Sequence, residues 1–352
     1  MPKRSTRLGA VAATLALAPL AATTSAAAPA QTSAKEFRLE QAIRLSPFGE
    51  RPAFSPDGGR IAFIGKAYGD AYEIELATGK IRNLTRNIPH QGIVRIQYLP
   101  DGNYLVTAPS RYVGPNSRAH LEMWVLDKSL DKALQPLREK PFEGIAVSRS
   151  RNMIAWTTIE PELSPEESWR LAFSRPTKRY VAEISYDRGI PKLVDKREIM
   201  PVLPKECGFI EPQDFRRGNS ELIFSCLGAG PGGTPLVSVM GYTLTSGAFV
   251  TYRREAGEYN EVEGIAADES WSTVECGQQS GPRLPPLDIC RLELKPNGTM
   301  TRLIIGAMPG STRHVSNPVV SPDGKWVAFQ SGDSTVGEEG EGLGVYLMKI
   351  AD

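Results

Sequence analysis

The sequence predicts an all-β fold made of several similar four-stranded antiparallel sheets. The first observation behind this prediction is a repeated hairpin, because residues 51–63 (RPAFSPDGGRIAF) and 317–329 (NPVVSPDGKWVAF) share one pattern near opposite ends of the chain. The second is the content of 28 prolines and 33 glycines in 352 residues, which is typical of many short strands joined by tight turns. The third is the spacing, since four strands fit into roughly 40 to 45 residues, the size of one β-propeller blade.

The first repeat shows how such a blade is built. Residues 53–54 and 61–64 are apolar and β-prone, and the Ser-Pro-Asp-Gly turn at 55–58 joins them. In this turn proline presets φ, aspartate bonds to nearby backbone groups, and glycine adopts a positive φ without steric cost. Residues 71–76 then alternate between apolar and polar side chains, as a half-buried strand does, and residues 81–85 supply the fourth strand.

Hairpins at a similar spacing predict four more blades. The Pro-Asp-Gly turn recurs at 100–102 in blade two, and other polar turns replace it in blades three to five. The predicted strands are residues 93–99, 104–107 and 121–126 in blade two, 144–148, 153–156 and 179–184 in blade three, 210–215 and 221–225 in blade four, and 263–266, 271–275, 287–294 and 301–305 in blade five.

The last blade begins with the second copy of the hairpin and continues through residues 344–350, so it has only three strands. A separate segment with loosely alternating apolar residues, 36–45, precedes the first blade. We expect this segment to be the missing fourth strand, because an N-terminal strand that completes the last blade closes the ring and protects its edges. The sequence thus predicts six blades. The alternative of seven requires a degenerate blade within residues 160–204.

The Pro-Asp-Gly hairpins also carry a resemblance to known families. The segments around Ser55-Pro-Asp-Gly58, Pro100-Asp-Gly102 and Ser321-Pro-Asp-Gly324 resemble the WD40-like repeats of the TolB family of periplasmic propellers. They are similar as well to the non-catalytic propeller of prolyl-oligopeptidase-type peptidases. The resemblance covers blades one, two and six by motif and blades three to five by register. It implies a fold and leaves the function open, because the same propeller serves binding proteins and several enzymes.

The N-terminus has the pattern of a secretory signal peptide. Lys3, Arg4 and Arg7 precede an apolar stretch, residues 8–20, and Ala28-Pro-Ala30 matches the small-residue cleavage pattern. We expect a signal peptide at residues 1–30, a single propeller domain at residues 31–352, and a periplasmic or secreted protein. The alternative is a retained membrane anchor, which the apolar stretch disfavours because it is too short to span a bilayer. No transmembrane segment is expected after cleavage.

Four cysteines fit an oxidising compartment. Their number is even, which predicts two disulfides among Cys207, Cys226, Cys276 and Cys290. Of the three pairings, we favour Cys207 with Cys226 and Cys276 with Cys290, because each pair flanks one predicted hairpin. A zinc site or buried free thiols are the alternatives, although the Cys-x-x-Cys spacing of zinc sites does not occur.

Composition and charge exclude one class of partner. The chain has 41 Lys and Arg against 40 Asp and Glu, so it lacks the basic excess that nucleic-acid binding requires. We therefore expect no nucleic-acid partner. The 41% hydrophobic and 23% charged residues are ordinary for a globular protein with a sizeable core.

One face of the predicted propeller is more elaborate than the other. The connections between second and third strands are long, whereas those on the opposite face are mostly tight turns. Long connections over a rigid scaffold favour a binding face, and drift in surface loops that tolerate insertions is the alternative. The long connections are residues 108–119, 160–178, 227–235, 277–286 and 331–343.

The first strand of each blade lines the central channel, and its opening residue should stand at the channel mouth. These residues carry charges of both signs, which suits a charged peptide or sugar, while internal pairing of the channel lining is the alternative. The candidate binding residues are Arg51, Arg95, Glu143, Glu211, Glu263 and Asn317.

Three histidines map to the same face in this prediction. His90, His120 and His314 suggest a divalent-metal site if they converge, and isolated surface histidines if they do not. The acidic loop at residues 333–341 lacks the spacing of the twelve-residue calcium loop and is expected to be solvated.

Signatures of catalysis are few. The Gly-x-Ser-x-Gly elbow of serine hydrolases does not occur, and the glycine-rich residues 227–233 are interrupted by a proline. The sequence therefore favours an exported binding or scaffold propeller without a cofactor, whose partner is a protein, peptide or glycan of the cell envelope. The alternatives are a metal-assisted lyase or hydrolase at the propeller mouth, and a stand-alone propeller related to prolyl-oligopeptidase-type peptidases.

Overall fold

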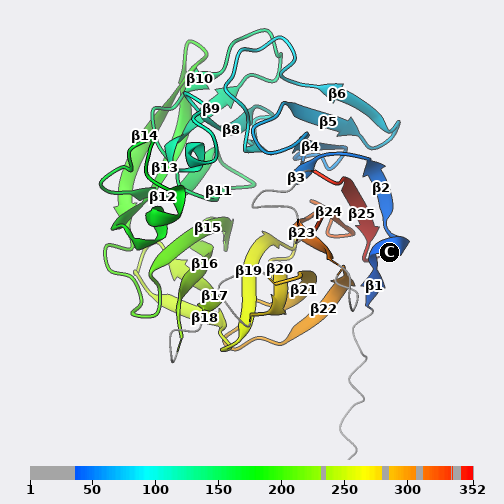
Figure 1. Cartoon of the computed structure of the whole chain (residues 1–352), viewed down its shortest axis with the longest axis vertical. Coiled ribbons are helices and arrows are strands. Elements are labelled where there is room, and N and C mark those ends of the chain that lie inside the picture. Colours follow the sequence, from blue (N-terminus) through cyan, green and yellow to red (C-terminus); the bar gives the residue numbers. More distant parts are fainter. Residues whose placement is uncertain are drawn as a thin grey trace, which may run out of the picture. The chain divides into compact units, whose positions relative to one another are not determined.

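Six antiparallel sheets follow one another along the chain around a common axis, as Figure 1 shows, and confirm the six-bladed β-propeller. The computed structural model describes residues 36–230, 235–279, 285–306, 312–333, 335 and 342–351. These residues belong to one compact unit, Ala34–Asp352. The signal peptide predicted at residues 1–30 lies outside the described residues. Within the described part of the chain, no helix has the length and apolar character needed to cross a membrane.

Blades one to three are regular four-stranded sheets in which strand order follows chain order. Their strands are β3 (Glu50–Phe54), β4 (Arg60–Ile64), β5 (Ala71–Glu75) and β6 (Lys80–Asn83) in blade one, β7 (Arg95–Tyr98), β8 (Tyr104–Pro109), β9 (Leu121–Leu126) and β10 (Gln135–Pro136) in blade two, and β11 (Ile145–Val147), β12 (Met153–Ile159), β13 (Thr177–Asp187) and β14 (Ile190–Ile199) in blade three.

Blades four to six continue the pattern, and the last two each gain a strand from the N-terminal segment. Their own strands are β15 (Phe209–Arg216), β16 (Glu221–Ala229), β17 (Pro235–Thr243) and β18 (Phe249–Arg253) in blade four, β19 (Glu258–Ile265), β20 (Trp271–Gln278), β21 (Asp288–Glu293) and β22 (Met300–Ile305) in blade five, and β23 (Arg313–Val320), β24 (Trp326–Asp333) and β25 (Val345–Lys349) in blade six.

The region suspected of hiding a seventh blade belongs to blade three. Residues 160–204 contain all of β13 and β14 and a short 3-10 helix, η3 (Trp169–Ser174). Both strands pair within blade three, β13 with β12 and β14 with β13. The fourth strand β14 escaped prediction because most of its residues are exposed or only partly buried, so no apolar alternation marks it.

The ring is closed by the N-terminal segment, but not by a single strand as predicted. Residues 36–45 are divided by a 3-10 turn, η1 (Leu39–Gln41). Before it, β1 (Phe37–Arg38) pairs in parallel with β22 of blade five, and after it β2 (Ile43–Ser46) pairs antiparallel with β25 of blade six. The N-terminal segment thus completes blade six as predicted, but through β2; the part around Phe37 pairs with blade five instead. Phe37 is buried in the core between blades five and six, and this burial draws its strand to blade five.

The core lies between neighbouring blades, and this position explains the apolar runs of the inner strands. In β4, Ile61 and Phe63 pack toward blade six, whereas Ala62 and Ile64 pack toward blade two. Both faces of such a strand are buried, so its sequence is continuously apolar instead of alternating. Each fully buried large side chain contributes about 1.5–3 kcal/mol of hydrophobic stabilisation.

The two Ser-Pro-Asp-Gly turns have the same hydrogen bonds. In blade one, the Ser55 hydroxyl donates to Asp57 Oδ1 at 2.5 Å and accepts from the Arg60 backbone N–H at 2.9 Å. In blade six, Ser321 bonds to Asp323 at 2.5 Å and accepts from the Trp326 N–H at 2.9 Å. The central glycines have φ values of +72° and +74°, which L-residues with a Cβ rarely adopt. The motif therefore repeats as local chemistry, independent of the distance along the chain.

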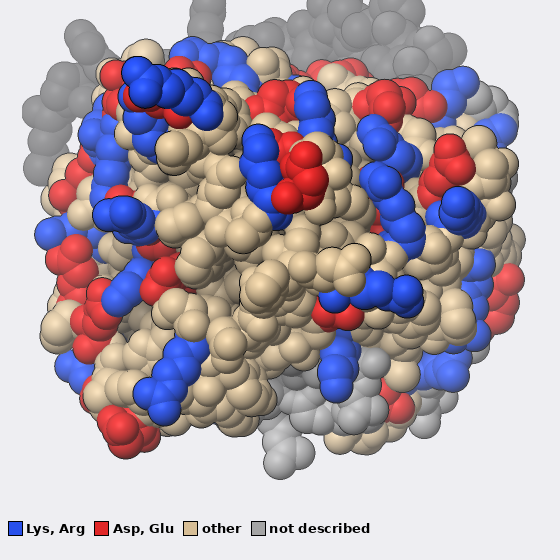
Figure 2. Space-filling model, turned by 90° about the horizontal axis from the view of Figure 1, so that it is seen from above, with Lys and Arg blue, Asp and Glu red and all other residues tan. Residues whose placement is uncertain are grey.

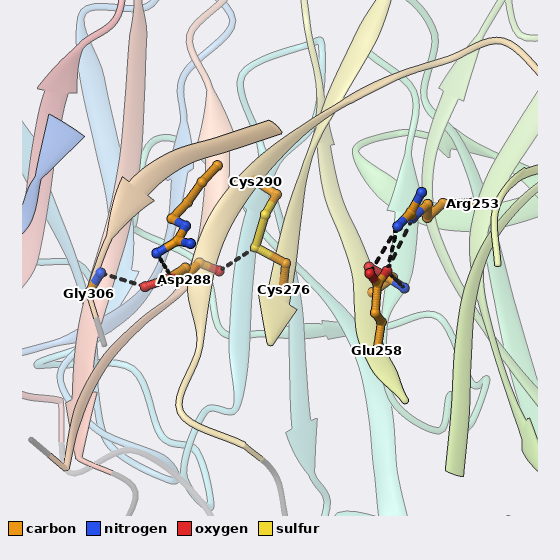
Figure 3. The surroundings of a disulfide bond; sticks show 8 residues. Arg253, Glu258, Cys276, Asp288, Cys290 and Gly306 are labelled. Atoms are coloured by element: carbon orange, nitrogen blue, oxygen red, sulfur yellow. Dashed lines mark hydrogen bonds and ion pairs between the residues drawn. A yellow bond between two sulfur atoms is a disulfide. The ribbon is translucent and has the colours of Figure 1, made fainter. Parts of the chain in front are cut away.

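Two disulfides join the pairs that the hairpin argument favours. Cys207 is bonded to Cys226 of β16, and Cys276 of β20 is bonded to Cys290 of the neighbouring strand β21. Figure 3 shows the second disulfide beside Asp288, whose carboxylate accepts a hydrogen bond of 2.9 Å from the Gly306 backbone N–H. Each disulfide joins residues of a single blade, the first in blade four and the second in blade five, so each stabilises its own blade.

Reduction of the disulfides is expected to destabilise the propeller. The sequence separations of 19 and 14 residues correspond to a loss of about 3 kcal/mol for each disulfide, because the unfolded chain regains freedom. Urea unfolding should be measured for the wild type and for a double variant, Cys276→Ala with Cys290→Ala. A midpoint that does not fall in the double variant would contradict this expectation.

Candidate functional site

The channel mouth carries a group of charged and polar side chains, most of them in or next to the first strands of the blades, which we call the mouth cluster. Its carboxylates interact with one another and with two arginines. The mouth cluster consists of Glu143, Glu211, Glu261, Glu263 and Glu275 with Arg51, Arg95, Tyr259 and Asn317. All six residues predicted at the channel mouth belong to it.

Irregular backbone turns several of these side chains inward. Arg51, Glu143 and Asn317 have φ values of +56°, +65° and +47°, a region that non-glycine residues seldom occupy. Register shifts interrupt β3 and β23 at the same places. Bulges of this kind redirect side chains and are common next to functional sites.

Asn317 connects two of the carboxylates. Its side-chain Nδ2 donates to Glu263 and Glu275 at 3.2 Å each, and its backbone N–H donates to Glu275 Oε1 at 2.5 Å. On the other side, the Tyr259 hydroxyl donates to Glu261. Gly144 leaves room for Glu211, because a Cβ at that position would lie 2.5 Å from Glu211 Oε1. The carboxylates are thus packed closely on the axis.

Burial is the main cause of raised pKa values in this cluster. It raises the pKa of Glu261 and Glu275 to about 8 and that of Glu263 to about 7, and neighbouring carboxylates add to the effect. Burial and the charge of Glu261 also raise the pKa of Glu211 well above its usual range. Near neutral pH, Glu261 and Glu275 therefore hold protons and can donate as well as accept hydrogen bonds.

An ion pair links the mouth cluster to the long connections of blades two and three. Arg118 lies in η2 (Asn116–His120), between the second and third strands of blade two, and donates through Nε to Glu143 at 2.8 Å. The guanidinium of Arg118 also lies 5.1 Å from the centre of the Trp169 ring in η3. Both partners of the ion pair are largely buried, with side-chain exposures of 14% and 8%.

The connections of blades two and three carry exposed apolar side chains, which we call the aromatic platform. The platform consists of Tyr112, Trp169, Leu171 and Phe173. Tyr112 is 50% exposed, Leu171 45% and Phe173 37%, and the Trp169 and Phe173 rings are 5.9 Å apart. Asn116 holds the two connections together, because its amide donates to the Pro165 carbonyl and accepts from the Trp169 backbone N–H. Large exposed apolar groups of this kind mark interaction sites.

Among the described residues, the predicted difference in loop length between the two faces of the propeller is seen mainly in blades two and three. In blade four, β16 continues to Ala229 and β17 begins at Pro235, so four of the nine residues of the predicted loop 227–235 are strand, and residues 231–234 lie outside the described part of the chain. Much of the predicted connections 277–286 and 331–343 lies outside the described residues, as do Glu338, Glu339 and Glu341 of the acidic loop.

The three histidines have separate surroundings. His90 shares a hydrogen bond of 3.0 Å between Nε2 and Asp70, while its Nδ1 accepts from the Gly92 N–H. His314 is the second residue of β23 and lies opposite Gly332, and burial lowers its pKa. Among the described residues, no group of three or more His, Cys, Asp or Glu is arranged to hold a metal ion. The structure therefore does not bring His90, His120 and His314 together as a metal site.

Sequence reasoning missed five important residues: Arg118, Trp169, Tyr259, Glu261 and Glu275. One signal was available, because Tyr259, Glu261 and Glu263 alternate along β19 and therefore face the same side. The prediction began this strand at Glu263 and so overlooked the first two. Arg118 and Trp169 lie in connections without periodicity, and only the packing of η2 against η3 brings them to the mouth cluster.

On the face shown in Figure 2, positive and negative side chains are interspersed over an otherwise uncharged surface. This view shows no continuous basic area, in agreement with the balanced composition of the chain.

Comparisons with known proteins bear on the fold. No family model and no curated protein sequence matches the chain. Among solved structures, the β-propeller domain of the Trilobed protease from Pyrococcus furiosus is similar with a TM-score of 0.50 and 10% identity, over 89% of this chain and 82% of that one. An oligogalacturonate lyase from Vibrio parahaemolyticus has a TM-score of 0.48 and 11% identity, over 85% and 78%. A putative TolB from Agrobacterium tumefaciens has a TM-score of 0.37 and 13% identity, over 85% and 76%. At these identities the likeness shows the β-propeller fold alone.

Proposed function

We propose that this protein is an exported binding propeller that recognises a protein, peptide or glycan of the cell envelope. The binding surface in this proposal is the face that carries the mouth cluster and the aromatic platform. The compartment is supported by the two disulfides, which form and persist in oxidising environments, and by the signal-peptide pattern of the sequence.

The observation that carries this proposal is the continuity of the two parts through Arg118. Its guanidinium pairs with Glu143 at the channel mouth and stacks near Trp169 in the platform. A ligand that covers Trp169 therefore also lies beside the buried charges of the channel. Aromatic and arginine side chains in such central positions contribute most of the energy in many interfaces.

The chemistry of the surface suits ligands with both apolar and polar groups. Tyr112, Leu171 and Phe173 expose apolar surface on which side chains of a peptide or rings of a sugar can pack. The Trp169 ring lies 5.1 and 5.0 Å from the Arg118 and Arg170 guanidiniums. Protonated Glu261 and Glu275 donate hydrogen bonds, whereas the arginines donate to carbonyl or carboxylate oxygens. The face therefore combines a hydrophobic anchor with directional polar groups.

The proposal can be tested with Trp169→Ala and Tyr112→Ala. Purified mature protein is screened against an array of synthetic peptides and an array of oligosaccharides, and hits are measured by titration calorimetry. We expect Trp169→Ala to weaken binding by about 10- to 100-fold, because truncation of a central aromatic anchor costs about 1.4–2.8 kcal/mol. Tyr112→Ala, which removes a half-exposed ring, should weaken binding by about tenfold.

Ile190→Ala is a matched control, since Ile190 is 66% exposed on β14, the outer strand of blade three. Its affinity should equal that of the wild type. A ligand that binds Trp169→Ala and Tyr112→Ala as tightly as the wild type uses another surface, and this result would contradict the proposal.

A further inference from the structure

A second candidate site lies at the other end of the channel, on the face of the tight turns. A cavity of about 330 Å³ opens there between the turns at Ser55, Pro100, Ser148 and Pro322. All six blades contribute to its wall, one residue from each being Phe54, Tyr98, Val147, Gln213, Gly264 and Val320. Its volume is at the lower end of the range for small-molecule sites, and its axial position is shared by many ligand sites in barrel-like folds.

Gln213 is the unusual residue of this cavity. In the pairing of β15 with β16, Pro212 lies opposite Phe224 and Asp214 opposite Ile223, so Gln213 is the extra residue of a bulge. Gln213 is only 6% exposed, and its Nε2 has no hydrogen-bond partner among the described groups. A buried amide donor without a partner is costly, and a ligand or an ordered water in the cavity would complete it.

The neighbours of Gln213 form a rigid frame. The Asp214 carboxylate accepts hydrogen bonds from the Arg149 guanidinium at 3.0 Å and from the Ile265 backbone N–H at 3.2 Å. Arg149 also donates to the Ile265 carbonyl, so these contacts tie blades three, four and five together. Asp214 is therefore occupied by structural partners, whereas the adjacent Gln213 faces the cavity with a free donor.

Glu263 adds an acidic group to the cavity wall. It accepts one long hydrogen bond of 3.2 Å from Asn317, which leaves further lone pairs of its carboxylate for a ligand. Its pKa of about 7, raised by burial, allows it to ionise when a cation approaches. The remaining wall combines apolar residues such as Phe54 and Val147 with polar ones, among them Gln97, Ser148 and Arg149.

We propose that the cavity binds a small ligand that carries a primary ammonium group next to an oxygen acceptor. The oxygen accepts from Gln213 Nε2, the ammonium group pairs with Glu263, and the apolar residues of the wall contact the carbon skeleton. The amino terminus of a peptide and an amino sugar share this chemistry. The site shares Glu263 with the mouth cluster. Gln213 is not part of that cluster, so Gln213→Met tests the cavity separately from the function proposed above.

Titration calorimetry at pH 7 tests the proposal with three probes. L-leucinamide represents a peptide amino terminus, D-glucosamine represents an amino sugar, and N-acetyl-L-leucinamide lacks the ammonium group. We expect at least one of the two amines to bind at one site per chain and the acetylated probe to bind at least about tenfold more weakly. The amine that binds with the higher affinity shows whether the site prefers a peptide amino terminus or an amino sugar. If neither amine binds at millimolar concentration, or if the acetylated probe binds equally well, the proposal is overturned.

Gln213→Met separates a ligand role from a structural one. This variant removes the unpartnered donor, so we expect a higher melting temperature together with a loss of amine affinity of at least about tenfold. Glu263→Gln should also weaken the amine, whereas Ile190→Ala, on the outer edge of blade three, should bind as the wild type does. A lower melting temperature for Gln213→Met, or unchanged amine affinity, would show that Gln213 serves the fold and would overturn the site.

Discussion

Removal of residues 31–47 from the mature chain is expected to abolish cooperative folding of the ring or to lower its melting temperature severely. This truncation removes β2, which supplies the fourth strand of blade six, and β1, which pairs with β22. It also removes Phe37, which is 8% exposed in the core between blades five and six. The truncated chain would expose the edge of β25 and an apolar surface that the closed ring buries.

Thermal unfolding followed by circular dichroism measures this effect. A shorter truncation that removes only residues 31–35 is the matched control and should melt as the full mature chain does. Phe37→Ala keeps both strands and is expected to lose about 3–5 kcal/mol of stability, the usual cost of removing a buried phenylalanine. An unchanged melting temperature after the longer truncation would refute the closure of the ring by this segment.

The stability of the propeller is expected to fall as the pH rises from about 5 to 9. Glu261 and Glu275 have folded-state pKa values of about 8 and Glu263 of about 7, all above the ordinary value of 4.5. Between the unfolded and folded pKa values the native state binds more protons than the unfolded state. The stabilisation from these groups is therefore complete below pH 4.5 and is lost as the pH passes 7 and 8.

Other groups act in the opposite direction but do not cancel this trend. Burial lowers the pKa of His314, so its contribution to stability increases as the pH rises through 6.5. Hydrogen bonds lower the pKa of Asp127 to about 2, and its contribution is already complete above pH 5. The carboxyl groups of the mouth cluster outnumber the single histidine, so their effect prevails from pH 7 to 9.

Denaturant unfolding at pH 5.5, 7 and 8.5 should therefore show decreasing midpoints. One pKa unit corresponds to about 1.4 kcal/mol for one group, so the total loss should reach a few kcal/mol. The double variant Glu261→Gln with Glu275→Gln should show a much smaller pH dependence, while the exposed Glu166→Gln should behave as the wild type does. A midpoint that stays constant from pH 5.5 to 8.5 in the wild type would contradict the raised pKa values.

Features that depend on neighbouring residues were predictable from the sequence. The two Ser-Pro-Asp-Gly turns form from hydrogen bonds within five residues, so their sequence identifies both hairpins. The inner strands are apolar on both faces and stand out for that reason, as in residues 61–64. The disulfides follow from the hairpins, because each joins cysteines that the same blade brings together.

Other features depend on contacts between residues far apart, and the sequence could not show them. Phe37 pairs with blade five because its side chain packs into the core between blades five and six. Arg118 contacts Glu143 and Trp169 only because the folded connections bring these residues together. The side-chain amide of Gln213, which lacks a hydrogen-bond partner, lies in a β-bulge, and no sequence motif predicts this bulge. Local turn chemistry and continuous apolar strands thus determined the six-bladed ring. The tertiary structure alone decided which polar groups are buried together on its axis, because burial and register arise only when the blades pack.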